Sequence, residues 1–163
     1  FFWLIVGCKP DVVGYSNVPE IRLNELKQVK RADATDSLVI LNVYFQDGDG
    51  DIGLEPEDVD PPFDFGSPYY HNFPVTYLVP DSLGEYVPLI NPNTMRIYES
   101  QHDRIPNLTP TGKYKGIDGE LEILLSANPA LLNIPKLKLS FHLQDRSLNV
   151  SNTITTRELF LTH

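Results

Sequence analysis

Apolar and polar residues alternate over long stretches of this chain, and this spacing limits its possible folds more than any other feature. In the run 136–144, every second residue is Leu or Phe, and Lys, Ser, His or Gln lie between them. A period of two is typical of a β-strand that buries one face. The run 119–125 repeats the pattern, and 38–45 is almost continuously apolar, as expected of a central strand. Further strands are predicted at 19–29, 75–79, 94–100 and 153–161.

Helices are expected to contribute little. The 163 residues include 14 prolines, and no stretch of a dozen residues shows a period of 3.6. About seven strands, separated by Pro, Gly, Asn and Asp, therefore predict an all-β domain in which two antiparallel sheets pack face to face as a sandwich. The chain is long enough for one such domain, which we place at 18–163.

The N-terminal residues 1–7 are almost entirely apolar, and Cys8, the only cysteine, follows them. This run is much shorter than the roughly 20 residues that span a bilayer. The sequence 4–8 resembles the lipobox of bacterial lipoproteins, which implies a signal-peptide remnant at 1–8, a lipid on Cys8 and a tether at 9–17 that leads to a membrane. The alternative is an ordinary first strand with a buried thiol.

Residues 47–74 interrupt the strand pattern with five prolines and few aliphatic residues. A connection of this length inside a compact domain is uncommon and tends to be functional or disordered. Eight carboxylates lie between residues 47 and 64 with no Lys or Arg among them, so this segment carries eight of the nine net negative charges of the chain. The net charge of −9 also argues against nucleic acid as a partner.

The acidic segment begins with alternating Asp and Gly residues, and alternating carboxylates in a tight turn can point to one centre. Oxygen ligands select a hard cation such as Ca²⁺, so we predict a structural calcium site formed by Asp47, Asp49, Asp51 and Asp58. A helix-flanked calcium loop is excluded, because Ile52 replaces its turn glycine and strands flank the segment. The alternative is a solvated hairpin connection, since Asp-Gly is also common turn chemistry.

Two parts of the sequence carry a family resemblance. The segment 46–54, followed by 105–106, Gly116, 119–121 and the hairpin sequence 143–156, resembles a group of uncharacterised envelope lipoproteins of Gram-negative bacteria. The resemblance implies an immunoglobulin-like or fibronectin type III-like sandwich, a lipid anchor and a cell-envelope location, with the outer membrane expected. It implies no agreed biochemical activity.

The last hairpin differs from that pattern at one position, where Leu148 stands in place of the usual Gly. Its short polar residues, Asp145, Asn149, Ser151 and Asn152, can bond nearby backbone groups and shape the turn. A second metal site there is the alternative to this folding role.

No catalytic motif is found, and we expect a protein that is not an enzyme. The four histidines lack another His or Cys at zinc-ligand spacing, and His142 is expected on the outer face of its strand. The aromatic residues Tyr69, Tyr70 and Phe73 follow the acidic segment. They can either form a platform for a polysaccharide or an envelope protein, or pin the loop to the sandwich.

Overall fold

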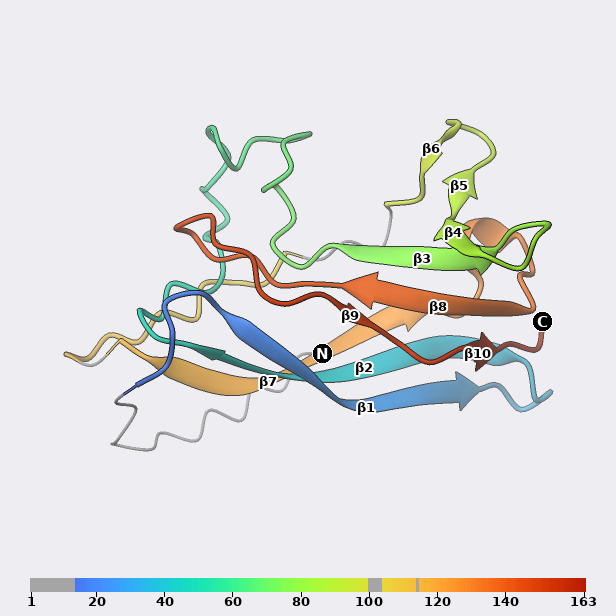
Figure 1. Ribbon diagram of the computed structural model, residues 1–163, viewed down its shortest axis with the longest axis horizontal. Helices are drawn as coiled ribbons and strands as arrows, with labels where there is room; N and C mark the ends of the chain where they lie inside the picture. The colour runs from blue at the N-terminus through green and yellow to red at the C-terminus, as the bar shows by residue number, and fades with distance from the viewer. Residues whose placement is uncertain (1–13, 100–103, 114) are drawn as a thin grey trace.

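The computed structural model describes residues 14–99, 104–113 and 115–163 (Figure 1). Cys8 and the signal-peptide remnant predicted at 1–8 lie outside these residues, so lipidation stays a prediction. The described part of the chain has no helix with the length and apolarity that crossing a bilayer requires.

Two antiparallel sheets make up most of the domain, as the alternating sequence predicts (Figure 1). The first sheet has the order β1-β2-β7. The second has the order β10-β8-β3-β4, and β9 also pairs with β8. A separate hairpin contains β5 and β6. The bounds are β1 Glu20–Lys30, β2 Asp36–Asp47, β3 Val75–Pro80, β4 Tyr86–Pro88, β5 Ile90–Asn91, β6 Arg96–Ile97, β7 Ile117–Ser126, β8 Lys136–Phe141, β9 Ile154–Thr155 and β10 Leu159–Phe160.

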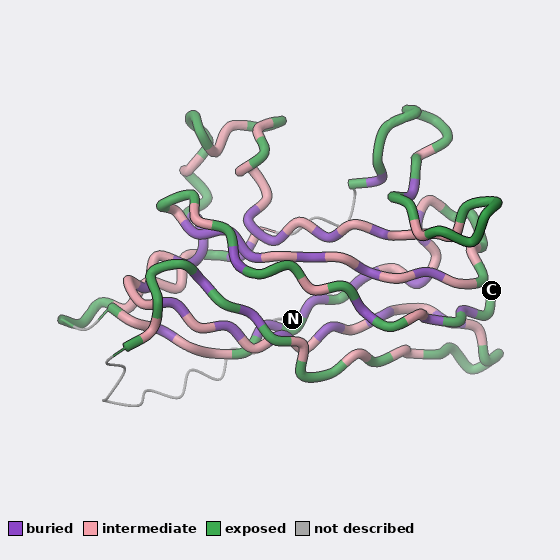
Figure 2. Tube along the Cα trace, viewed as in Figure 1, coloured by how far each residue is buried: buried purple, intermediate pink, exposed green. Residues whose placement is uncertain are grey.

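One hydrophobic core contains residues from both sheets. Along β2, alternate residues from Val39 to Phe45 are buried, and along β8 the buried residues are Leu137, Leu139 and Phe141. Figure 2 shows buried positions alternating with less buried ones along these strands. The inward side chains of one sheet thus pack on those of the other, which is how a two-sheet sandwich forms its core.

The described residues contain ten strands instead of about seven, and the differences lie where the period of two is broken. The prediction at 94–100 is reduced to β6, the strands β4 and β5 were not predicted, and 153–161 is divided into β9 and β10. Between these two strands, Thr156 N–H donates to the Leu139 carbonyl at 2.8 Å, and Thr156 Oγ1 accepts from Leu139 N–H at 3.0 Å. A side-chain hydroxyl thus replaces a backbone acceptor, and the segment stays attached to β8 without being a regular strand.

Asn72, which precedes β3, also bonds a neighbouring backbone segment through its side chain. It is buried, its Oδ1 accepts from Ile105 N–H at 2.6 Å, and its Nδ2 donates to the Ile105 carbonyl at 3.0 Å. This pair of bonds holds the segment after residue 104 beside the start of β3.

We expect Asn72→Ala to lower the free energy of unfolding by about 2 kcal/mol, because it leaves the buried Ile105 N–H without a partner and removes one of the two hydrogen bonds to the Ile105 carbonyl, which still accepts from Leu54 N–H. Urea unfolding of the two proteins measures the difference. Asn107→Ala provides a control, since the Asn107 side chain bonds the exposed Glu55 carboxylate. An equal loss in both variants would contradict this role of Asn72.

Candidate metal centre

The alternating Asp-Gly segment begins at the last residue of β2, Asp47, and turns sharply. Gly50 and Gly53 have φ of 65° and 93°, a region that favours glycine. A Cβ at Gly50 would lie 1.7 Å from the Lys115 carbonyl oxygen, and one at Gly53 would lie 1.9 Å from that of Pro106. The two glycines therefore allow the segments around 106 and 115 to pack directly on the loop.

The N-terminal end of the described chain also contacts this loop. Gly48 N–H donates to the Ser16 carbonyl at 2.8 Å, and the Asn149 side-chain amide donates to the Asn17 carbonyl at 3.3 Å. Residues 16 and 17 are thereby attached to both the acidic loop and the last hairpin. Loop and hairpin are thus held by the same short segment.

The last hairpin meets the acidic loop directly, although about 90 residues separate them in the sequence. An antiparallel bridge pairs Ile52 with Asp145. The Asp51 Oδ2 accepts from Ser147 N–H at 2.9 Å and from Ser147 Oγ at 2.7 Å, and the Asp51 carbonyl accepts from Arg146 N–H at 3.2 Å. These contacts place the Asp145 side chain next to the carboxylates of the loop.

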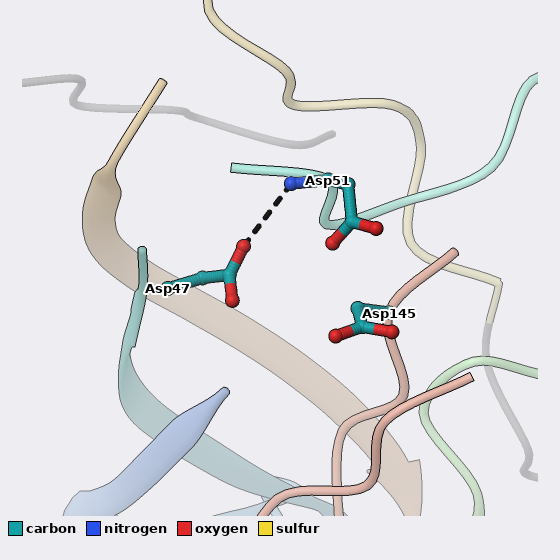
Figure 3. A group of neighbouring side chains, drawn as sticks. All are labelled: Asp47, Asp51 and Asp145. Carbon is teal, nitrogen blue, oxygen red and sulfur yellow. Dashed lines mark hydrogen bonds between the residues drawn. The ribbon is translucent and has the colours of Figure 1, made fainter. Parts of the chain in front are cut away.

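Three carboxylates meet at this point, and we call Asp47, Asp51 and Asp145 the acidic cluster. One oxygen of each lies within 4.8 Å of one oxygen of the others. Asp47 is 0% exposed, Asp145 is 2% exposed, and Asp51 is half-buried. Figure 3 shows the three side chains pointing toward a common space.

Each member of the acidic cluster has one or both oxygens fixed by a hydrogen bond. Asp47 Oδ2 accepts from Asp51 N–H at 3.1 Å (dashed in Figure 3), and the Asp145 oxygens accept from the backbone and side-chain nitrogens of Asn149, both at 2.8 Å. These bonds set the direction in which the carboxylates point. Among the described residues, no Lys, Arg or His forms an ion pair with the cluster.

Three further carboxylate oxygens are buried and have no hydrogen-bond partner: the Oδ1 atoms of Asp47, Asp49 and Asp51. A buried acceptor without a partner costs roughly 1–3 kcal/mol, and more when it is charged. Three such atoms in five consecutive residues are far from the usual case, in which buried polar groups are satisfied. A bound cation is the simplest partner for all three.

Electrostatics point the same way. Burial raises the pKa of the Asp47 carboxyl to about 7, and the charge of Asp49 adds to the rise. Burial also raises the pKa of Asp145, although the hydrogen bonds from Asn149 oppose it. Burial and neighbouring like charges disfavour the ionised form of these carboxyl groups. A bound divalent cation would favour the ionised form, because it neutralises the negative charges.

The donor set of the acidic cluster consists of oxygen atoms, which suits a hard cation rather than zinc or copper. Ligand oxygens lie about 2.3–2.6 Å from Ca²⁺, so two oxygens on opposite sides of one ion are about 4.6–5.2 Å apart. The 4.8 Å limit on the separations in the cluster is compatible with that span. The cluster could therefore hold a metal ion.

Comparison with known proteins found no relative. No family model, no curated protein and no solved structure matches this chain. The assignment of the site therefore depends on the geometry described above.

The predicted ligands are partly brought together. Asp47 and Asp51 belong to the acidic cluster, and Asp49 contributes a buried oxygen beside it. Asp58 does not join them: its Oδ2 accepts from Glu55 N–H at 2.8 Å and caps a separate exposed turn. Asp145 takes the place expected for Asp58, because the turn of the last hairpin is bridged to Ile52. Asp145 thus accepts the hydrogen bonds that shape the turn and also belongs to the group that could hold a metal ion.

The last hairpin turns at Leu148, the position where the resembling sequences were expected to have Gly. Leu148 has a φ of 67°, the region that glycine favours, and its N–H donates to the Asp145 carbonyl at 3.3 Å. Leucine therefore adopts a backbone conformation at this turn that glycine adopts more easily.

The aromatic residues after the acidic segment have different environments. Phe73 is fully buried and stacks on Phe141 with ring centroids 5.6 Å apart, so it belongs to the core and not to a surface platform. Tyr69 and Tyr70 are half-buried. The Arg104 guanidinium lies 4.8 Å from the centre of the Tyr70 ring and donates to the carbonyls of Tyr70 and Asp58. Arg104 thus links residue 58 of the acidic segment to residue 70, and the platform role expected for Tyr69 and Tyr70 stays a prediction.

Proposed function

We propose that this protein is a non-catalytic, lipid-anchored cell-envelope protein whose β-sandwich domain contains a structural calcium site. The observation that carries the calcium proposal is the set of three buried carboxylate oxygens without partners in the acidic loop. The lipid anchor and the envelope location are supported by the lipobox-like sequence that ends at Cys8.

The role proposed for the ion is to join the two sheets. Asp47 ends β2 of the first sheet, whereas Asp145 follows β8 of the second sheet. A cation between them fixes the acidic loop against the last hairpin at one end of the sandwich. We propose the immunoglobulin-like or fibronectin-like class for this sandwich, which is supported by its two antiparallel sheets.

Calcium titration of the full chain tests the site. After treatment with a chelator, calorimetry is expected to detect one Ca²⁺ per chain. Asp145→Asn is expected to weaken binding at least about tenfold, because it removes a charged ligand. Asp58→Asn, a matched change in the same acidic segment, is expected to bind calcium as the unchanged chain does. Equal binding by unchanged protein and Asp145→Asn would show that the cluster is not the site.

The anchor is tested separately in a bacterial host. We expect the protein with its signal sequence to incorporate a labelled fatty acid and to sediment with membranes, because two or more acyl chains give stable attachment. Cys8→Ala is expected to lose both properties. Membrane attachment that survives this substitution would refute the lipid on Cys8 and leave the calcium site untouched.

A further inference from the structure

A cleft of about 1050 Å³ lies outside the core, between residues 65–74 and the β5–β6 hairpin. In Figure 1, these two segments rise from the same side of the second sheet. The volume is at the upper end of the range of about 300–1,000 Å³ that is usual for ligand sites. The cleft is distinct from the acidic cluster, because no member of the cluster lines it.

His142 and Gln144 line the cleft just beyond the end of β8. The Gln144 side-chain amide donates to His142 Nε2 at 3.2 Å, so the two side chains fix each other. Burial lowers the pKa of His142, which keeps the imidazole neutral and able to accept this bond. The strand pattern predicted an exposed His142 on the outer face of its strand, but the side chain is half-buried in the cleft.

Gln144 presents an acceptor that the protein does not satisfy. The residue is 7% exposed, and its Oε1 is buried without a hydrogen-bond partner. An amide oxygen in this condition is costly unless a donor reaches it from the cleft. Because this oxygen has almost no accessible surface in this structure, a ligand hydroxyl or N–H reaches it only after the Gln144 side chain turns toward the cleft.

An aromatic ring stands on one wall of the cleft. Phe65 is 85% exposed, and its ring and that of Tyr70 form a T-shaped pair with centroids 5.3 Å apart and an interplanar angle of 81°. Tyr70 is in turn held by Arg104. A phenyl ring that is exposed to water yet braced from behind offers an apolar face to a ligand.

Among the residues that the structure describes, the charges that line the cleft cancel. These lining residues include one arginine, Arg96, and one glutamate, Glu99, together with the amide and hydroxyl groups of Asn91 and Thr94. This wall comes from the β5–β6 hairpin, its turn and Glu99, the second residue after β6. A balanced, hydrogen-bonding wall selects neither an anion nor a cation, in contrast to the acidic cluster.

We propose that this cleft binds a neutral oligosaccharide. Sugar hydroxyls supply donors for Gln144 Oε1 and partners for the opposite wall, and the apolar face of a pyranose ring matches the exposed Phe65 ring. The cleft is open to solvent, which suits a chain longer than one sugar unit. The proposal does not depend on calcium and extends the proposed function.

Titration of the full chain with cellohexaose, xylohexaose, maltohexaose and chitohexaose tests the proposal. We expect at least one of them to bind with a Kd of about 1 mM or lower, measured by calorimetry and by NMR shifts of the cleft residues. Tetra-alanine is titrated in parallel as a peptide probe. Binding by none of the four saccharides, or tighter binding of the peptide, would overturn the proposal.

Matched variants locate the binding. Phe65→Ala is expected to weaken the best saccharide about tenfold, whereas Phe160→Ala removes another phenylalanine that is 68% exposed and is expected to change nothing. Gln144→Leu keeps a side chain of similar size but removes the amide group, and it is expected to weaken binding to a similar extent. Equal effects of Phe65→Ala and Phe160→Ala would place the saccharide outside the cleft.

The saccharide measurements are repeated on Asp145→Asn, which changes the acidic cluster and leaves every residue that lines the cleft unchanged. Retained saccharide binding is expected, because Gln144 and Asp145 face different sites. Failure of calcium binding with intact saccharide binding would refute the proposed metal site alone, and the reverse result would refute the cleft alone.

Discussion

Calcium at about one hundred times its Kd is expected to raise the free energy of unfolding by about 2.7 kcal/mol, because the ion binds the folded cluster and not the unfolded chain. For a domain of this size, the melting temperature should rise by roughly 5–10 °C. The physical cause is the conversion of mutual repulsion among buried carboxylates into attraction to a shared cation. Thermal unfolding with calcium and with a chelator measures the shift.

Asp47→Asn separates this effect from ordinary destabilisation. The variant keeps an oxygen that can accept from Asp51 N–H, and it removes a buried charge that burial and Asp49 disfavour. We therefore expect the calcium-free variant to be at least as stable as the calcium-free unchanged chain, and calcium to stabilise it much less. A large stabilisation by calcium that persists in Asp47→Asn would contradict the assignment of this residue as a ligand.

Gly53→Ala is expected to cost at least about 3 kcal/mol, which is at the upper end for single substitutions. Two causes add together: the positive φ of 93°, and a Cβ placed 1.9 Å from the Pro106 carbonyl oxygen. Pro106 cannot easily retreat, because Leu54 N–H donates to the Ile105 carbonyl at 2.9 Å and Asn107 N–H donates to the Leu54 carbonyl at 3.1 Å. Urea unfolding measures the loss.

Gly84→Ala is the matched control for the backbone contribution. Gly84 has a φ of 86°, close to that of Gly53, but nothing lies within 4 Å of its added Cβ. We expect a loss of about 1–2 kcal/mol from the left-handed conformation alone. If both alanine variants lost the same stability, the close approach of residues 53 and 106 would have no energetic weight.

The sequence was most informative where side chains alternate strictly. The runs 38–45, 119–125 and 136–144 correspond to β2, β7 and β8, because burial of one face fixes both the period and the pairing. It was least informative at 153–161, where the Thr156 hydroxyl takes over a backbone bond. A side-chain hydrogen bond that takes the place of a backbone one leaves no periodic signal in the sequence, since it depends on one residue and its partner across the sheet.

The candidate site shows the same division. Local spacing was sufficient to single out Asp47 and Asp51, since both lie in one tight loop. Asp58 was selected by its distance along the sequence, yet the loop turns away before reaching it. Asp145 was recognised as a turn residue, but its place beside Asp51 follows from the Ile52–Asp145 bridge. A pairing over about 90 residues is a property of the assembled sheets, and the spacing within either segment does not encode it.

The attachment of residues 16 and 17 to the acidic loop and the last hairpin has a mechanical consequence. Tension applied ahead of residue 14 reaches Gly48 and Asn149 before it reaches the body of either sheet. Gly48 follows Asp47 in the acidic loop, and Asn149 lies in the same hairpin as Asp145, so both are close to members of the acidic cluster. If Cys8 holds the protein to a membrane, as proposed, a bound cation would therefore connect the acidic loop to the last hairpin at the place where tension enters the domain.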